Sequence, residues 1–463
     1  MASIWRETAD FPAFLPLEGD ARTRVLIVGG GITGILCCYH LAKAGADCML
    51  LETDRLCGGT TQNTTAKITA QHGLIYHRLI KNKGREAAGL YLAANLDALE
   101  EYRRLCREVD CDFHEEDSFV YARKDRGPLE RETAALKELG FPARLVKDTA
   151  LPFPVAGAVR FPGQARFHPL RFLASIAKGL PIHEGTRVLE LMPGAAVTHH
   201  GTVRAEKIII ATRFPIRGIH GGYFLKLYQQ RSYLLALRGA GAVGGMYIGE
   251  EDGKSTLSFR DLKGLAAGGA YPGEKDGEGR FSLRGSEDLL LLGGGGHRTG
   301  KKGGGWGPLL AFARKYWPGA EEVSRWAAQD CVTLDGMPYI GEYSGGTKGL
   351  YAAAGFGKWG MTSAMVSARL LTDLVLGKAS PYKRLFDPSR GMLHKQLAVN
   401  ALESTAGLLT PTLPRCPHLG CALKYNPRER SWDCPCHGSR FGEDGKLLDG
   451  PATDDLRHPP GKR

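Results

Sequence analysis

The stretch TRVLIVGGGITGILCCYHLAKAGADCMLLE, residues 23–52, decides the fold of the first part of this chain. The apolar run 25–28 predicts a buried strand, the glycine turn 29–34 follows it, and an apolar helix is expected to continue to about Ala44. A second predicted strand, 47–51, ends at Glu52. A strand, a glycine turn, a helix and a second strand in this order are typical of a dinucleotide-binding βαβ unit.

Each glycine of the turn has a physical task in such a unit. Gly29 permits the tight turn, Gly31 lets a pyrophosphate approach the backbone, and Gly34 lets the helix pack closely on the strand. The phosphates would lie at the helix N-terminus, where free N–H groups favour an anion. Glu52 is placed to accept hydrogen bonds from a ribose. A glycine-rich turn in an unrelated α/β fold is the alternative, and the completeness of the unit argues against it.

Composition and charge narrow the function classes. The chain has 463 residues, enough for two or three domains, and its net charge of +12 favours anionic partners. The basic residues are scattered and no RNA-binding motif is present, so we expect no nucleic-acid partner. The longest apolar stretch, 25–51, is broken by glycines and charges, so no membrane span is expected. The N-terminus lacks a signal-peptide pattern, and we expect a cytoplasmic protein.

The polar loop after Glu52 favours FAD over NAD as the dinucleotide. NAD enzymes normally return to a third strand here, whereas RLCGGTTQNTTAKITAQHG, residues 55–73, is rich in glycine and threonine. A hydroxyl-rich loop suits the pyrimidine edge and the ribityl chain of a flavin. Within it, GGTTQNTTAK resembles the flavin-facing loop of the D-amino-acid oxidase superfamily of FAD enzymes, which includes glycine and sarcosine oxidases.

Two later stretches resemble the same superfamily. VRAEKIIIATRFPI, residues 203–216, is similar to the strand that returns against the FAD, and GFGKWG, residues 355–360, is similar to a loop at the flavin ring. The resemblance covers about 22–385 and implies FAD as the cofactor. The candidate FAD-binding residues are Gly29, Gly31, Ile32, Thr33, Gly34, Glu52, Thr60, Thr61, Thr65, Ala211, Thr212, Gly357, Lys358, Gly360 and Met361.

The resemblance also implies the domain organisation. It predicts an α/β (α+β) fold in which a Rossmann-like FAD-binding domain carries an inserted antiparallel-sheet substrate domain, together spanning 22–390. We expect FAD-binding segments at about 22–87, 150–220 and 330–385, and substrate segments at about 88–149 and 221–329. Apolar residues at three- and four-residue spacing predict a helix over 88–109. The basic, glycine-rich stretch 297–307 predicts a solvated loop.

Members of the superfamily oxidise amines or amino acids by passing a hydride to the flavin, which implies a small amine or amino-acid substrate. Arg260 is the first candidate to bind a substrate carboxylate, because the planar guanidinium matches that group. Lys358 and Trp359 are the other candidates for catalytic residues, and a structural role remains the alternative for each. The weaker candidates on the same expected sheet are Arg231, Tyr233 and His297.

Two fragments near the C-terminus, CPHLGC at 416–421 and CPCHGS at 434–439, contain four of the eleven cysteines. The spacing C-x-H followed by C-x-x-H supplies two thiolates and two imidazoles, which can ligate the two irons of a [2Fe–2S] cluster. The candidate ligands are Cys416, His418, Cys434 and His437. A zinc knuckle that uses four of the six residues and a purely structural disulfide pair are the alternatives.

The same fragments resemble the Rieske iron–sulfur domain of respiratory cytochrome bc complexes. In that domain the two remaining cysteines link the cluster loops, which implies a disulfide between Cys421 and Cys436. A full Rieske domain has several strands before its first cluster loop, but here 391–410 predicts a linker helix. The resemblance therefore implies a shortened Rieske-type module in 411–463.

Together these features predict an FAD-dependent oxidoreductase that acts on C–N bonds. Its Rieske cluster would relay single electrons to an acceptor that the sequence does not identify, which favours a dehydrogenase over an oxidase. A flavin and iron–sulfur redox sensor or scaffold without substrate turnover is the alternative. A flavoprotein acting on RNA is a third, motivated only by the net charge.

Overall fold

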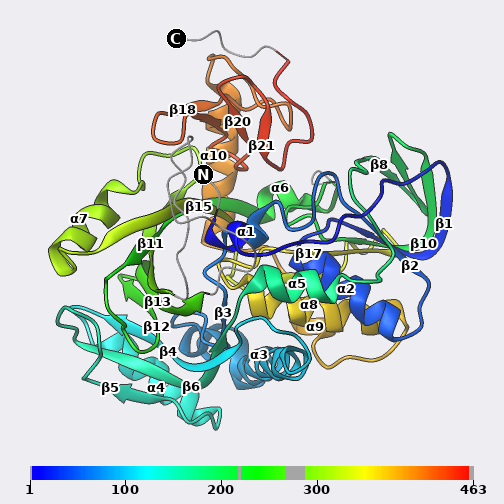
Figure 1. Cartoon of the computed structure of the whole chain (residues 1–463). Coiled ribbons are helices and arrows are strands. Elements are labelled where there is room, and N and C mark those ends of the chain that lie inside the picture. Colours follow the sequence, from blue (N-terminus) through cyan, green and yellow to red (C-terminus); the bar gives the residue numbers. More distant parts are fainter. Residues whose placement is uncertain (1–2, 217–219, 266–286, 458–463) are drawn as a thin grey trace.

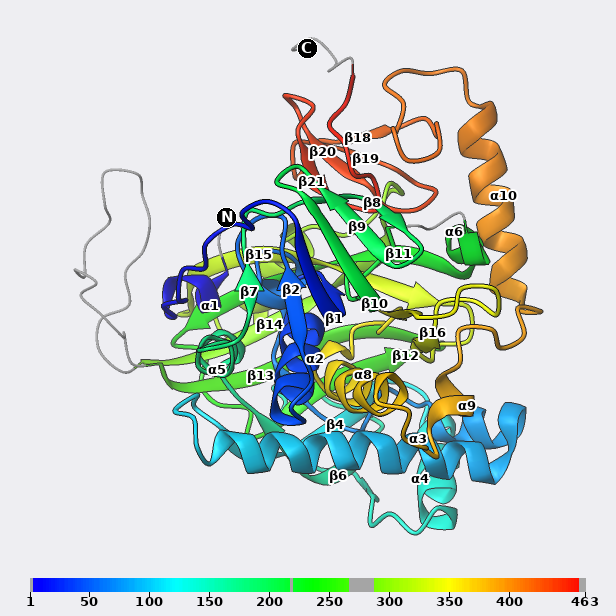
Figure 2. The same cartoon turned by 90° about the vertical axis from the view of Figure 1, so that its right-hand side faces the viewer.

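The computed structural model describes residues 3–216, 220–265 and 287–457, and Figures 1 and 2 show how their elements are arranged. These residues form an eight-stranded, a nine-stranded and a four-stranded sheet. Part of the expected substrate segment, 266–286, and the end of the C-terminal module, 458–463, lie outside the described residues.

The eight-stranded sheet contains the predicted βαβ unit. Strand β1 pairs in parallel with β2 on one side and with β10 on the other, and β10 pairs in parallel with β17. Alternate residues of β1 enter two different apolar clusters, as expected for a parallel strand that is covered on both faces. The strands are β1 (Ala21–Val28), β2 (Cys48–Leu51), β7 (Ile182–His183), β8 (Val188–Met192), β9 (Ala195–Thr198), β10 (Thr202–Ile210), β16 (Tyr339–Glu342) and β17 (Leu350–Ala354).

Two helices, α2 (Ile32–Lys43) and α8 (Gly360–Val375), pack against each other beside this sheet. Helix α2 lies very close to the turn that precedes it, because a Cβ atom added to Gly34 would overlap the carbonyl oxygen of Gly29. The predicted Rossmann-like unit is thus confirmed, with strand and helix bounds close to those expected.

The nine-stranded sheet is antiparallel except for the parallel pair β4 and β12. Strand β6 lies in this sheet although it falls within the expected FAD-binding segment 150–220, so the domain boundaries stay a prediction. The strands are β3 (Lys67–Ile68), β4 (His114–Ala122), β5 (Arg144–Val146), β6 (Gly157–Arg166), β11 (Leu227–Arg238), β12 (Met246–Glu251), β13 (Lys254–Leu265), β14 (Glu287–Arg298) and β15 (Glu321–Thr333).

The helix expected at 88–109 starts earlier, as part of α3 (Tyr76–Cys106), which is kinked at Gly84 where φ is 87°. Helices α3 and α4 lie at the end of the molecule opposite the C-terminal sheet (Figures 1 and 2). The remaining helices of this part are α1 (Ile4–Glu7), α4 (Gly127–Glu138), α5 (Pro169–Ile176), α6 (Tyr223–Lys226), α7 (Gly307–Tyr316) and α9 (Lys383–Phe386), with 3₁₀ turns η1 (Thr60–Asn63) and η2 (His220–Gly222).

The C-terminal module packs against the rest of the molecule, next to the expected linker helix, which is α10 (Lys395–Leu409) (Figure 1). Its four short strands are β18 (Lys424–Asn426), β19 (Ser431–Asp433), β20 (Arg440–Gly442) and β21 (Leu447–Asp449).

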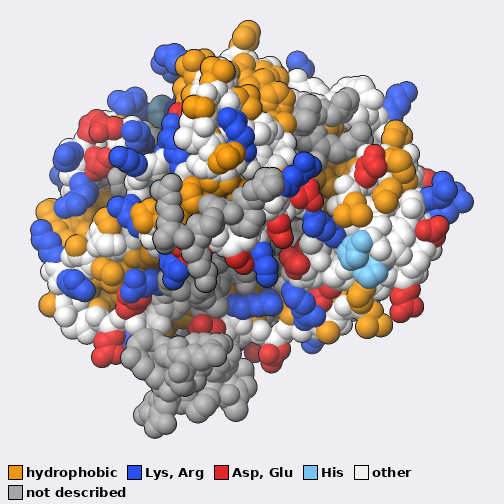
Figure 3. Space-filling view, turned by 90° about the horizontal axis from the view of Figure 1, so that it is seen from above, with side chains coloured by type: hydrophobic (Ala, Val, Ile, Leu, Met, Phe, Trp, Pro, Cys, Tyr) orange, Lys and Arg blue, Asp and Glu red, His pale blue; other side chains and the backbone are white. Residues whose placement is uncertain are grey.

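On the face seen from above, lysine and arginine side chains are dispersed among acidic and apolar ones (Figure 3). Among the described residues, no helix combines the length and the apolar character needed to cross a bilayer.

Candidate functional site

A cavity of about 790 Å³ is lined by residues of the eight-stranded sheet, the nine-stranded sheet and the C-terminal module. All the candidate FAD-binding residues line it except Gly34, which is buried beneath the glycine turn. Its other walls come from the loop 57–65, from 186–188 next to β8, and from the strands β11, β13, β14 and β15. The structure therefore brings the cofactor residues predicted from distant parts of the chain into one site.

Two side chains accept hydrogen bonds from the backbone of the glycine turn and the start of α2. Thr61 Oγ1 accepts a hydrogen bond of 3.1 Å from the N–H of Ile32, the first residue of α2. Glu52 accepts hydrogen bonds from the N–H groups of Gly30 at 2.6 Å and of Asp54 at 3.0 Å. Burial nevertheless raises the pKa of Glu52 above its usual value. Glu52 thus lines the cavity and also supports the turn, and its contact with a ribose stays a prediction.

The loop before α8 lies at the other side of the cavity. Gly360 and Met361, the first residues of α8, line the cavity, so the positive end of this helix dipole faces it. Trp359 stacks on His72 with 4.9 Å between ring centroids. Burial lowers the pKa of His72 to about 3, so this ring is neutral.

Lys358 lines the cavity with a φ angle of 77°, which is unusual for a residue with a side chain. Burial lowers the pKa of Lys358, while the nearby Asp330 opposes this shift. Burial likewise raises the pKa of Asp330, which also lines the cavity. Asp330 is not predicted from the sequence, since nothing in the local pattern of β15 marks it.

Arg260 does not line the cavity. Its guanidinium donates hydrogen bonds to the carbonyl oxygens of Thr65 and Phe167 and lies 5.3 Å from the ring centroid of Trp5. With a side chain that is almost wholly buried and occupied by protein groups, Arg260 is poorly placed to bind a substrate carboxylate.

Lys67 is a basic residue near Arg260 that faces the cavity. It lines the cavity, and its Nζ atom donates hydrogen bonds to Ser258 Oγ at 2.6 Å and to the carbonyl oxygen of Tyr247 at 2.7 Å. Burial, helped by the positive charge of Arg260, lowers the pKa of Lys67 to about 7. Sequence reasoning could have found Lys67, because it is the single lysine or arginine in the flavin-facing loop after Arg55.

Two of the three weaker candidates on the sheet, Tyr233 and Arg231, contact the C-terminal module. Tyr233 lines the cavity and donates a hydrogen bond of 3.0 Å to Glu429 of that module. Arg231 and His297 do not line it: Arg231 pairs with Glu429, and His297 stacks on the Tyr233 ring at 5.8 Å.

The four predicted cluster ligands come together at one end of the module. The thiols of Cys416 and Cys434 are buried, and the rings of His418 and His437 lie 5.1 Å apart. The Nδ1 atoms of both histidines are buried and have no hydrogen-bond partner among the described residues. A buried imidazole nitrogen without a partner costs free energy unless a ligand occupies it, so this donor set fits a metal cluster.

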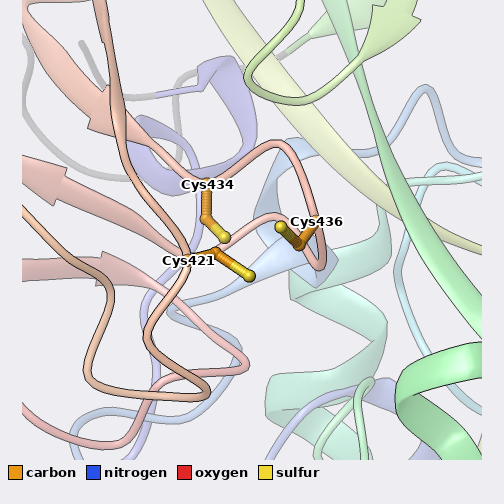
Figure 4. Close-up of side chains that lie close together, drawn as sticks. All are labelled: Cys421, Cys434 and Cys436. Carbon is orange, nitrogen blue, oxygen red and sulfur yellow. The ribbon is translucent and has the colours of Figure 1, made fainter. Parts of the chain in front are cut away.

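Three cysteine thiols, those of Cys421, Cys434 and Cys436, lie within 4.8 Å of one another (Figure 4). The disulfide expected between Cys421 and Cys436 is not formed, and both residues are free cysteines. The Cys434 thiol shares the space beside them, so that the sulfurs make a three-way contact rather than a closed pair. Hydrogen bonds from the neighbouring thiols, that of Cys416 above all, lower the pKa of Cys434 and favour its thiolate.

A buried polar network fixes the module against the nine-stranded sheet. Glu429 pairs with Arg231 of β11 and, at 2.9 Å, with Arg440 of β20. Beside it, Gln229 Nε2 donates to the carbonyl oxygen of His437 at 2.9 Å, and Gln329 Nε2 donates to that of Gly438 at 2.8 Å. Hydrogen bonds therefore reach directly from the sheet to the second cluster loop.

The stretch 297–307, expected as a solvated loop, lies partly against the module instead. Arg298 donates hydrogen bonds to the carbonyl oxygens of Pro435 at 3.2 Å and Cys436 at 3.0 Å, and Lys301 pairs with Glu403 of α10 at 2.6 Å. Arg298 and Lys301 thus serve contacts within the chain.

Replacement of Glu429 by glutamine is expected to destabilise the docked module. The charges of Arg231 and Arg440 lower the pKa of Glu429 although burial opposes this, so the stabilisation is present at neutral pH and is lost as the pH falls through the folded-state pKa. Arg231 would be left as a buried charge without its main partner, and we expect a loss of about 3 kcal/mol in the free energy of unfolding by urea. Glu443→Gln, which removes an ion pair with the exposed Arg430, is the control and should change little.

Comparison with known families accounts for the combination of a dinucleotide-type cavity with a C-terminal module of cysteines and histidines. The profile of the FAD dependent oxidoreductase family, DAO, matches residues 24–374, which contain nearly all of the βαβ unit and all of the cavity lining outside the module. The chain belongs to this family. The Rieske [2Fe–2S] domain profile matches 389–460, which contains α10 and the four-stranded sheet. The family binds FAD and the Rieske domain binds a [2Fe–2S] cluster, which confirms both predicted cofactors.

A Bacillus subtilis protein, YhfW, named for a Rieske 2Fe–2S cluster, is 31% identical and covers 98% of this chain and 97% of its own length. The cytochrome b6-f complex iron–sulfur subunit 3 of a Nostoc species is 51% identical over 42 residues, which are 9% of this chain and 24% of that subunit. Glycine oxidase from Geobacillus kaustophilus superposes with a TM-score of 0.63 at 20% identity, over 80% of this chain and all of its own. L-proline dehydrogenase from P. horikoshii superposes with a TM-score of 0.61 at 17% identity, over 81% of this chain and 98% of its own.

Proposed function

We propose that this protein is a dehydrogenase for a small amine or amino acid, and that its Rieske module delivers single electrons to an external acceptor. When bound, FAD supplies two-electron oxidation of a C–N bond and the cluster supplies one-electron transfer. The observation that carries the proposal is the contact of the module with the cavity: six residues between 447 and 455 line it, and Gln229 joins the sheet to the second cluster loop.

Structural neighbours support the substrate class. Glycine oxidase and L-proline dehydrogenase share the fold of this chain, and both are named for amino acids. The cavity of this chain offers Lys67 and Lys358 as cations and Ser258 and Tyr233 as hydroxyl groups. A cation paired with a nearby hydroxyl is suited to a carboxylate, so an amino acid fits the cavity better than a simple amine.

The test compares oxygen with a soluble one-electron acceptor, the latter in the absence of oxygen. Purified protein that holds FAD and iron is mixed with a panel of amino acids and amines, and turnover is followed with oxygen or with a soluble one-electron acceptor. The proposal predicts flavin reduction by at least one amino acid and faster turnover with the one-electron acceptor. Reduction of both cofactors by dithionite but by no substrate would instead favour the redox sensor, and faster turnover with oxygen would identify an oxidase.

The Lys67→Met variant is expected to raise the KM for an amino-acid substrate. Loss of a hydrogen bond to a charged group costs about 1.5–3 kcal/mol, which corresponds to roughly a 10- to 150-fold increase in KM. An amine without a carboxylate should be affected much less. Lys263→Met, a change at an exposed lysine on the same strand as Ser258, is the control.

The pH profile gives Lys67 a separate signature. A lysine with a pKa of about 7 loses its charge as the pH rises, so kcat/KM for the amino acid should fall as the pH rises through about 7. In Lys67→Arg the charge persists, and this fall should disappear. An unchanged KM in Lys67→Met would show that the carboxylate binds elsewhere.

A further inference from the structure

The C-terminal module supplies part of the cavity wall. This wall segment is 447–455, which comprises β21 and the turn after it. Its residues that line the cavity are Leu447, Leu448, Asp449, Ala452, Thr453 and Asp455. The FAD dependent oxidoreductase profile ends at residue 374, so the family match assigns no role to this segment.

Two ion pairs hold the wall segment against loops of the dinucleotide site. Asp449 pairs with Arg213 at 2.6 Å, and Arg213 also donates a hydrogen bond of 2.7 Å to Thr60 of the flavin-facing loop. Farther along the segment, Asp454 pairs with Arg187 at 3.2 Å. Arg187, Arg213 and Thr60 all line the cavity themselves. The wall segment therefore extends from the flavin-facing loop to the loop before β8.

The wall segment is also attached to the cluster loop. The N–H of Ala452, a buried residue, donates to Ser439 Oγ at 2.9 Å, and the N–H of Cys434 donates to the carbonyl oxygen of Ser439 at 2.8 Å. Gln229 joins the two as well, because its Nε2 atom donates to the carbonyl oxygens of His437 and Gly450, each at 2.9 Å. The position of the wall thus depends on the fold of the cluster loop.

We propose that residues 447–455 of the Rieske module are part of the FAD-binding site, so that this site is shared between the two domains. FAD affinity then depends on the docked module and, because coupling between two equilibria is reciprocal, bound FAD strengthens the docking of the module. This proposal concerns cofactor binding and holds whatever substrate the protein oxidises.

Leu448 offers a test because it lines the cavity and is 55% exposed, so that a polar replacement leaves the core intact. Leu448→Glu places a negative charge beside the site of a cofactor that carries a pyrophosphate, whereas Leu448→Gln has the same shape without the charge. Lys424→Glu places a negative charge on β18 of the same module, away from the cavity. The dissociation constant of FAD is measured by titrating FAD into FAD-depleted full-length protein at low salt, and iron content is measured alongside.

The proposal predicts that Leu448→Glu weakens FAD binding about tenfold, while Leu448→Gln and Lys424→Glu change it less than about twofold. Equal affinities for the two Leu448 variants, or an equal loss in Lys424→Glu, would overturn it. Hydrogen exchange of the unmodified protein tests the proposal independently of any variant. Adding FAD to the depleted protein should protect 447–455 and leave β18 unchanged, and an absence of protection there would also overturn the proposal.

Discussion

Replacement of Cys434 by serine is expected to remove nearly all iron from the protein. The Cys434 side chain is 1% exposed and belongs to the group of three cysteines shown in Figure 4. A thiolate is the preferred ligand for an iron–sulfur cluster, and a serine hydroxyl neither ionises at neutral pH nor has the softness of sulfur. Iron content, visible absorption and EPR spectra of anaerobically purified protein provide the measurement.

The same substitution should destabilise the module. Its four strands have three residues each, and its buried apolar cluster contains the cysteines themselves. A unit this small rarely folds without a metal or another cross-link, so the melting temperature of the module should fall together with the iron content. FAD should remain bound more weakly rather than be lost, because most of its cavity is formed by the oxidoreductase domain.

Cys421→Ser is the matched control for the assignment of the ligands. Cys421 belongs to the same buried group of sulfurs, but it is not one of the four proposed ligands. The Cys421→Ser variant should therefore retain the cluster. Full iron in Cys434→Ser, or complete loss of iron in Cys421→Ser, would show that the ligand set is different. Zinc in place of iron in the unmodified protein would contradict the match to the Rieske domain.

Replacement of Gly34 by alanine is expected to weaken FAD binding about 10- to 100-fold. The added Cβ atom would overlap the carbonyl oxygen of Gly29, which is backbone and has little room to move. Either helix α2 or the glycine turn must shift, and such overpacking costs about 1–3 kcal/mol. The shift displaces the N–H groups at the start of α2 on which a pyrophosphate binds. The FAD content of the purified variant and its FAD dissociation constant report the effect.

Gly59→Ala is the control for this prediction. Gly59 also lines the cavity, but its φ angle is negative and a Cβ atom added there has no heavy atom within 4 Å. FAD binding should be nearly unchanged in this variant. Normal FAD affinity in Gly34→Ala would mean that the close approach of helix and turn is not needed for binding.

The features that were predicted correctly have local signatures. The run 25–52 carries its strand, turn and helix in consecutive residues, and the turn therefore folds much as expected. The pairs Cys416 with His418 and Cys434 with His437 are each within three positions, so the chemistry of the cluster site is visible in two short fragments. The match to the Rieske domain confirms the type of cluster.

The prediction that Arg260 binds a substrate carboxylate shows what local sequence patterns cannot decide. Residues 256, 258 and 260 alternate onto one face of β13. Thr256 and Ser258 line the cavity, but Arg260 lies beyond its edge, where Thr65, Phe167 and Trp5 surround it. The end of a cavity along a strand depends on which other segments pack there, and Lys67 enters this space from a different strand.

By itself, the sequence determined the α/β class of this protein, the FAD-binding turn and loops, and the residues able to hold a [2Fe–2S] cluster, because each depends on neighbours within about thirty positions. Only the tertiary structure decided that Lys67 faces the cavity and that the Rieske module forms one of its walls. The contact of Arg213 with Asp449 joins residues more than two hundred positions apart. No periodicity or short spacing encodes such a contact, since it arises from the packing of complete sheets on each other.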